Sequence, residues 1–191
     1  MMYLTYGKIV NFRYSKTLSL VVVYSMRCSL LIRKTTQEDL AVLDQLFDTC
    51  RVYMKAQGNP TQWDENYPTA KVVAQDVLSG HGYVCVDEQN QVLASFALGD
   101  YEAEYDRLQN GKWNSDEPYI VIHRMGALPE KGAGNFIFKE LTSKYPYIRI
   151  DTHEDNKTML HLLEKFGFKF CGIVHYPGYG DRVAYDYVRP N

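Results

Sequence analysis

The sequence lacks several features that would indicate common classes of protein. Its 191 residues carry a net charge of only −2, so no excess of either sign predicts binding to nucleic acid or to an anionic membrane. The four cysteines, Cys28, Cys50, Cys85 and Cys171, lie far apart and form neither a CxxC pair nor a zinc-finger spacing. We therefore expect reduced thiols in a cytoplasmic protein without a metal site.

A long apolar run is also missing. The most apolar stretch, KTLSLVVVYSMRCSLLI, follows several basic residues and resembles a weak signal peptide. However, no small-residue cleavage site follows it, Arg27 interrupts it, and it is shorter than the ~20 residues that a membrane helix needs. We expect residues 1–29 to be a dispensable or poorly ordered N-terminal extension, followed by a single domain over residues 30–191.

What the sequence does contain is enough apolar material, 46 %, for the core of a globular domain. Residue patterns predict strands at 30–34, 82–86, 92–98, 119–128, 147–151, 168–176 and 182–188. They predict helices over 40–54, 69–78, 135–145 and 156–166, the first announced by the capping pattern TTQEDL. This order predicts an α/β (α+β) fold, with a mixed, mostly antiparallel central sheet, flanking helices and one parallel β-α-β crossing.

The crossing contains the glycine pair of EKGAGNF, residues 130–136, between the longest strand and a helix start. The first amides of a helix have no partner inside it, and glycine lets a ligand approach the backbone. Such a turn favours an anion, most naturally a phosphate, and Lys131 adds positive charge. The GK[ST] ending of a P-loop and a complete GxGxxG are absent. A tight turn without a ligand is the alternative.

A second block, IRIDTHEDNKTMLHLLEKFGFKFCGI, spans residues 148–173. In it a strand ends at Asp151, polar residues follow, and a helix begins after Asn156, which is a strong candidate for its N-cap. Gly167 is suited to end that helix.

Together, these blocks and the order of the elements resemble the GNAT superfamily of acyl-CoA-dependent N-acetyltransferases, over about Leu30 to Val188. The resemblance implies that acetyl-CoA is the co-substrate and that an amine of a small molecule or peptide attacks the acetyl group directly. The alternative is a catalytically weak CoA-binding sensor or regulatory module of the same fold. We expect the amine acceptor to be the binding partner and expect no binding to nucleic acid or membrane. Formation of a homodimer is left open.

The resemblance also implies where coenzyme A binds. Its pyrophosphate is expected at the glycine turn, formed by Lys131, Gly132, Ala133, Gly134 and Asn135. The pantetheine arm is expected along Met125, Gly126 and Ala127, where their strand splays from its neighbour, with Asn156 beside the arm. The sequence departs from the family pattern twice, because Pro129 replaces the usual Arg or Gln and Leu163 replaces the usual tyrosine acid.

Acetyl transfer to an amine needs a base that takes the proton of the nitrogen, directly or through water. His123 is the first candidate, since it precedes the pantetheine segment and imidazole titrates near neutral pH; a core histidine is the alternative. His153 is the second candidate base; the alternative is a histidine that bonds the backbone of a turn. Tyr185 is a candidate acid; the alternative is a tyrosine of the core.

Two further groups carry charge that could reach an acceptor. The acidic residues of the long polar connection over 100–118 are Glu102, Glu104 and Asp106. They are expected either to bind a cationic acceptor or to form a solvated surface. Arg124 is expected to bind either a carboxylate of the acceptor or a structural acid.

Overall fold

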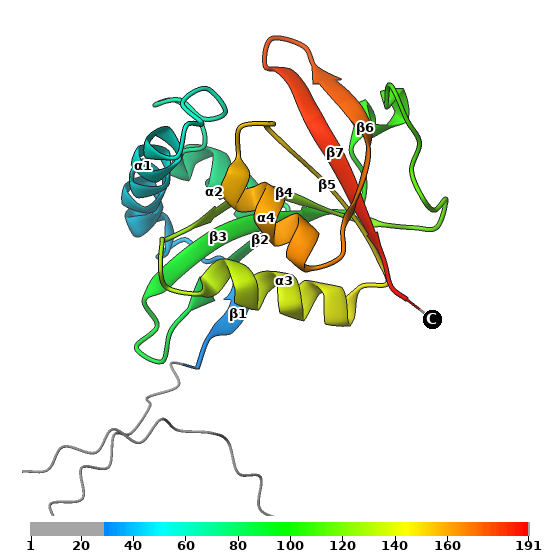
Figure 1. Cartoon of the computed structure of the whole chain (residues 1–191). Coiled ribbons are helices and arrows are strands. Elements are labelled where there is room, and N and C mark those ends of the chain that lie inside the picture. The colour runs from blue at the N-terminus through cyan, green and yellow to red at the C-terminus, as the bar shows by residue number, and fades with distance from the viewer. Residues whose placement is uncertain (1–28, 191) are drawn as a thin grey trace, which may run out of the picture.

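The computed structural model describes residues 29–190, so the predicted extension lies outside the described residues except for Ser29. The strands are β1 (Leu31–Lys34), β2 (Gly82–Val86), β3 (Val92–Gly99), β4 (Ile120–Ala127), β5 (Tyr147–Thr152), β6 (Lys169–Tyr176) and β7 (Gly180–Val188). The helices are α1 (Leu40–Ala56), α2 (Ala70–Leu78), the short 3₁₀ helix η1 (Ala103–Arg107), α3 (Ala133–Lys144) and α4 (Lys157–Lys165). Every predicted strand and helix is present, in the predicted order (Figure 1).

The strands form one sheet in the order β1-β2-β3-β4-β5-β7-β6. All neighbours are antiparallel except β4 and β5, which are parallel and joined by α3. The predicted fold class and its single parallel crossing are therefore confirmed. Among residues 29–190, no helix combines the length and the apolar character needed to cross a bilayer.

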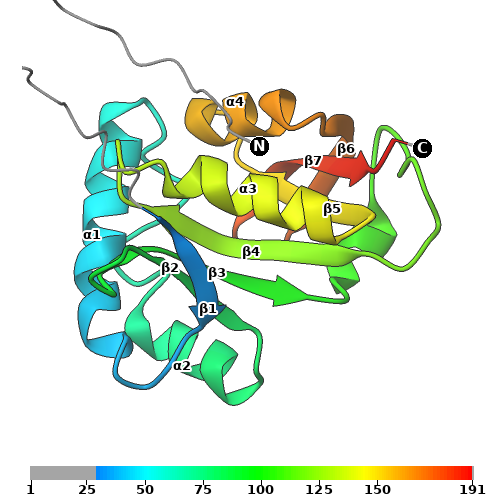
Figure 2. The same cartoon turned by 90° about the horizontal axis from the view of Figure 1, so that it is seen from below.

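Helices cover both faces of this sheet. Figure 2 shows α3 and α4 on one side and α2 on the other. Under α3 and α4 lies the larger core, which buries Ile137, Phe138 and Leu163 against strands β3 to β5. On the other face, α1 buries Leu43 and Phe47 with Val73 of α2 and the inner residues of β2. The apolar residues of these helices thus lie on the faces that pack against the sheet.

The cap of α1 and the start of α3 differ from the sequence patterns. Helix α1 begins at Leu40, after a turn in which Asp39 accepts hydrogen bonds from the backbone N–H and the hydroxyl of Thr36. The N-cap residue is therefore Asp39 rather than the threonine of the capping pattern, and the threonine hydroxyl donates to its carboxylate. Helix α3 begins at Ala133, two residues earlier than predicted, because Gly132 takes the left-handed conformation (φ 73°) that ends the loop.

The connection over residues 100–118 is fixed to the sheet by a buried polar cluster. Asp186 of β7, 1 % exposed, accepts bonds from the backbone and side-chain nitrogens of Asn114 and from the hydroxyl of Tyr147. The guanidinium of Arg149 lies over the rings of Trp113 and Tyr119, at 4.3 and 3.9 Å from their centroids. These contacts hold the connection, and with it η1, at one end of β4.

Strands β4 and β5 pair over only two residues, Ile120 with Ile148 and Val121 with Arg149. Beyond these pairs they diverge while each keeps its other neighbour, β3 or β7. A bulge in β4 adds one residue against β3, and Arg124 in this bulge has a φ of 51°. The divergence opens the sheet on the side of the bulge.

Candidate active site

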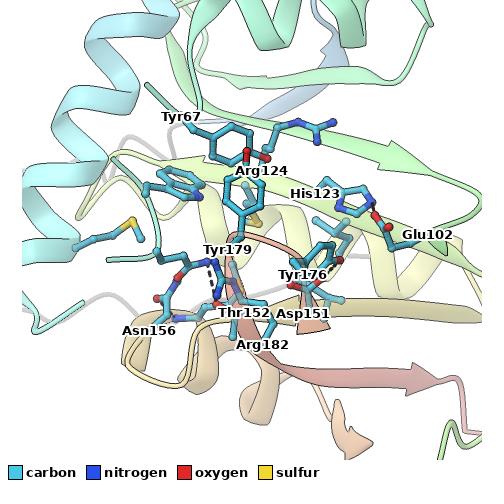
Figure 3. Close-up of a pocket in the computed structure, with 17 residues that line it drawn as sticks. Tyr67, Glu102, His123, Arg124, Asp151, Thr152, Asn156, Tyr176, Tyr179 and Arg182 are labelled. Carbon is cyan, nitrogen blue, oxygen red and sulfur yellow. Dashed lines mark hydrogen bonds and ion pairs between the residues drawn. The ribbon is translucent and has the colours of Figure 1, made fainter. Parts of the chain in front are cut away.

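A pocket with a volume of about 320 Å³ lies where β4 and β5 diverge (Figure 3). Seven segments of the chain line it. Strands β4 and β5 contribute Ile122, His123, Arg124, Met125, Ile150, Asp151 and Thr152. The remaining lining residues are Met54 of α1, Gln62, Trp63 and Tyr67 of the following loop, Glu102 of the connection, Asn156 and Met159 at the start of α4, and Tyr176, Tyr179 and Arg182 of the β6–β7 hairpin.

His123 faces Glu102 across one end of this pocket. The imidazole Nε2 lies 3.4 Å from the carboxylate Oε2, and the two side chains are 19 % and 21 % exposed. Burial lowers the pKa of His123 to about 4, and the charge of Arg124 and the proximity of His81 act in the same direction. Burial raises the pKa of Glu102, and the negative charge of Asp151 adds to the increase. His123 is therefore neutral at pH 7, and it titrates well below the near-neutral range that its residue type predicts.

Asp151, at the end of β5, anchors a hydrogen-bonded group beside this pair. Its Oδ1 accepts bonds from the hydroxyls of Tyr105, at 2.8 Å, and Tyr176, at 3.0 Å. Burial raises the pKa of Asp151, while the two tyrosine bonds lower it. The pKa of each tyrosine is raised, first by burial and then by the charge of Asp151. Neither hydroxyl is therefore suited to give up its proton near neutral pH.

Arg124 binds a structural acid, which decides between the two alternatives for this residue. Its Nε and Nη2 donate to the two carboxylate oxygens of Asp76 in α2, at 3.0 and 2.6 Å. The positive φ of Arg124 places its side chain in the pocket wall and toward α2. Its charge is thus balanced inside the protein.

The three predicted catalytic residues do not come together. Only His123 lines the pocket. His153 lies in a turn, where its Nδ1 accepts a bond from the backbone N–H of Asp155 at 3.2 Å. Tyr185 packs edge-on against Phe170, with ring centroids 5.7 Å apart, beside the core under α3 and α4.

Leu163, at the position of the usual tyrosine acid, is fully buried in the same core. No hydroxyl can therefore reach the pocket from this position.

The glycine turn leaves the first turn of α3 open to a ligand. Phe136 donates to the carbonyl of Gly132, whereas the amides of Ala133, Gly134 and Asn135 precede the first intrahelical bond. Lys131 is exposed beside them.

Two of these residues also have structural roles. A Cβ added at Gly134 would lie 3.3 Å from Leu162 Cδ1, so this glycine lets α3 approach α4 closely. The side chain of Asn135 accepts a bond from Lys165 in the last turn of α4.

The segment predicted to bind the pantetheine arm follows the bulge of β4. Met125 lines the pocket, and Gly126 is buried so tightly that an added Cβ would lie 3.3 Å from Cys50 Sγ. The thiol of Cys50 donates to the carbonyl of Ala127, and burial raises its pKa to about 11, so it stays protonated.

Asn156 lies in the pocket wall with both ends of its amide in use. Its Oδ1 caps α4 through the N–H of Met159, and its Nδ2 donates to Gln62 Oε1 at 2.9 Å. The predicted N-cap is therefore present. Contact of this side chain with a pantetheine arm stays a prediction.

Sequence reasoning missed several residues of this site, chiefly Tyr176, Arg182 and the loop residues Gln62, Trp63 and Tyr67. Asp151 was recognised only as the end of a strand. A polar run after a buried strand was the one available signal, and it does not say which side chains face the opening.

No protein-family model matches the chain, and no curated protein matches it. Solved structures match over most of its length. A GNAT-family acetyltransferase from Streptococcus agalactiae is 29 % identical, with a TM-score of 0.74, and the match covers 85 % of this chain and 96 % of that one. The chain has the fold of the GNAT superfamily. The resemblance predicted from the glycine turn and the helix that follows Asn156 is thus confirmed.

Two further solved structures share the fold at lower identity. A Staphylococcus aureus protein, provisionally named an acetyltransferase, is 24 % identical with a TM-score of 0.60, over 84 % of this chain and 99 % of that one. A Salmonella typhimurium protein, also provisionally named an acetyltransferase and solved with acetyl-CoA as its cofactor, is 15 % identical with a TM-score of 0.52, over 85 % and 95 %.

Proposed function

We propose that the chain is an acyltransferase that moves an acetyl group from acetyl-CoA to the amine of a small molecule or peptide. The observation that carries the proposal is the pocket between the diverging strands β4 and β5, whose lining residue Met125 lies close to Gly134 in the open first turn of α3. The Streptococcus agalactiae structure, named a GNAT-family acetyltransferase, supports this class of reaction. The Salmonella typhimurium protein, with the same fold and bound acetyl-CoA, supports the choice of donor.

Acetyl-CoA fits two backbone features, the free edge of β4 and the open first turn of α3. Where β4 leaves β5, the backbone groups on its free edge lack a strand partner and can bond the amides of a pantetheine arm along Met125, Gly126 and Ala127. The amides at the start of α3, with Lys131 beside them, supply donors and positive potential for the pyrophosphate. The thioester would then lie in the pocket near His123.

The reaction follows by direct attack. The neutral amine nitrogen attacks the thioester carbonyl carbon, the C–N bond forms, and the C–S bond breaks to release the CoA thiolate. His123, neutral at pH 7, takes the proton that the nitrogen loses and passes it to solvent or to the thiolate. His153 and Tyr185 have no part in this scheme because they lie outside the pocket.

Leu163 gives some support to the alternative, a CoA-binding module without transferase activity, because it leaves the usual acid position empty. A thiolate is a good leaving group that solvent can protonate, so the transferase needs no dedicated acid. We therefore favour catalysis.

The test separates donor binding from turnover. Acetyl-CoA is titrated into the protein by calorimetry, and thiol release is then followed with a panel of primary amines. Binding with amine-dependent thiol release is the expected result. Binding without release from any amine would favour the sensor, and the absence of binding would overturn both.

A further inference from the structure

The charges that line the pocket indicate the class of acceptor. Four charged side chains line it: Glu102, Arg124, Asp151 and Arg182. Arg124 is balanced by Asp76. Within the described part of the chain, neither Glu102 nor Asp151 has a lysine or arginine nitrogen within 4 Å, and the only salt-bridge partner of Glu102, His123, is neutral. Two carboxylates therefore face the pocket without a close ion pair to a lysine or arginine, although the charge of Arg182 acts on Asp151 and that of Arg124 acts on Glu102.

These carboxylates are half-buried, where an unpaired negative charge is costly. They lie close enough for the charge of Asp151 to raise the pKa of Glu102. The hydroxyls of Tyr105 and Tyr176 nevertheless bond to Asp151 in a way that stabilises its charged form. In Figure 3, Asp151 and Tyr176 lie beside the His123–Glu102 pair. A bound cation would offset the repulsion at this end of the pocket.

Aromatic rings surround the same space. Trp63, Tyr67, Tyr176 and Tyr179 all line the pocket. The face of an aromatic ring attracts a cation and also accommodates apolar groups. The lining thus combines carboxylates for an ammonium group with rings for an apolar body.

We propose that the acceptor is an apolar or aromatic amine without an acidic group, whose ammonium binds between Glu102 and Asp151. This rests on the proposed function, because it assigns a substrate class to the same pocket. In the reaction, the ammonium gives one proton to the carboxylate of Glu102, which releases it to solvent. The nitrogen lone pair so freed attacks the thioester, and the nitrogen loses its second proton to His123.

Arg182 favours a different class of acceptor, an amine that also carries a carboxylate. It lines the pocket, its charge lowers the pKa of Asp151, and among residues 29–190 its guanidinium donates only to the carbonyl of Asp181. An acceptor with a carboxylate beside its amine would pair with Arg182. That acceptor would also bring its carboxylate to the end of the pocket that holds Glu102 and Asp151, so we favour the amine without an acid.

Three matched compounds separate these cases: 2-phenylethylamine, L-phenylalaninamide and L-phenylalanine. The amide has the size of the amino acid without its negative charge. Calorimetry with CoA in place of acetyl-CoA measures their binding without turnover. We expect the amine and the amide to bind at least about tenfold more tightly than the amino acid.

Two variants test the carboxylate. Glu102→Gln should weaken binding of 2-phenylethylamine by at least about tenfold, because it removes a charged acceptor. Glu104→Gln is the matched control, since Glu104 lies on the same connection but pairs with Arg107 and does not line the pocket. It should leave the affinity unchanged.

Tight binding of phenylalanine that Arg182→Gln abolishes would overturn the inference in favour of an acid-bearing acceptor. Failure of both the amine and the amide to bind would also overturn it, as would equal effects of the two glutamate variants. Thiol release with other amines would in each case leave the proposed function standing.

Discussion

At His123, the surroundings change the chemistry that the residue type predicts. An exposed imidazole titrates near pH 6.5, but burial, the charge of Arg124 and the proximity of His81 lower the pKa of this one to about 4. The ring is then neutral throughout the physiological range. Its ionisation cannot set the pH dependence of the rate near neutrality. That dependence is instead set by the ionisation of the amine or of the carboxylates beside His123.

We expect His123→Gln to lower kcat/KM by ~10²–10⁴, the usual loss when a general base is removed, and to leave acetyl-CoA affinity unchanged. Glutamine keeps a hydrogen-bonding group of similar size without a site for the proton. Steady-state kinetics with one acceptor and calorimetry with acetyl-CoA measure the two effects. Near-normal kcat/KM would make His123 a structural residue.

The same residue should make the fold sensitive to acid. Because the pKa of His123 is lower in the folded state than the ordinary 6.5, the unfolded chain takes up a proton first as the pH falls. The contribution of neutral, buried His123 to the free energy of unfolding is at most about 3 kcal/mol. It is complete above pH 6.5 and is lost as the pH falls toward 4. Glu102 and Asp151, whose pKa values are raised, act in the opposite direction. Denaturant unfolding from pH 7 to 4 should therefore show a smaller loss in His123→Gln than in the wild type, and parallel curves would contradict this.

Some residues of the site were predictable and others were not. The N-cap role of Asn156 follows from local sequence, because the capping bond is made to the first turn of its own helix. Asp151, Tyr176 and Glu102 lie up to 74 positions apart and meet only because β5, β6 and the connection to β4 reach the same end of the sheet. No local pattern contains that information.

At the scale of elements, the connection over residues 100–118 differs most from its sequence. Its acidic residues are expected either to bind a cationic acceptor or to form a solvated surface; in the structure Tyr105 is buried and Glu102 faces the pocket. The reason is the pairing of Asn114 with Asp186 and the stacking of Trp113 on Arg149, which join segments distant in sequence.

Removing Asp186 should therefore affect both stability and the acceptor. Asp186→Ala leaves three donors, two from Asn114 and one from Tyr147, without their acceptor and should lower the free energy of unfolding by about 2–5 kcal/mol. It should also raise the KM for the amine, while acetyl-CoA affinity is kept. Asp116→Ala, at an exposed position of the same connection, is the control. If both variants behave alike in chemical denaturation, the cluster does not hold the connection.

The start of α3 allows a similarly direct test. Lys131→Glu places a negative charge beside the open amides and should weaken acetyl-CoA binding about 5–30-fold at low salt, with less effect at high salt. Lys139→Glu makes the same charge change at an exposed position farther along α3 and should have little effect. S-acetyl-pantetheine, which lacks the pyrophosphate, should bind both variants alike. If Lys131→Glu weakened the binding of S-acetyl-pantetheine as much as that of acetyl-CoA, the pyrophosphate would not bind at this turn.

For the whole molecule, the sequence predicts the order of elements and the parallel crossing because apolar periodicity and capping are local. The helix start at Ala133 and the bulge at Arg124 escape it, since each depends on one unusual φ angle. The divergence of β4 from β5 was implied only by the family resemblance, and the apolar pattern of the two strands does not show where their pairing ends.

That divergence has a consequence for the kinetics of isotope exchange. Past Val121 and Arg149, the facing edges of β4 and β5 have no ladder between them, although each strand lies in the middle of a seven-stranded sheet. Backbone amides on these edges should exchange with deuterium much faster than the amides that bond β3 or β7. A pantetheine arm would supply their missing acceptors, so CoA should slow exchange in this central gap and leave the outer strands unchanged. Mass spectrometry of peptides over 120–128 and 147–153 would therefore locate the CoA binding site without an amine substrate present.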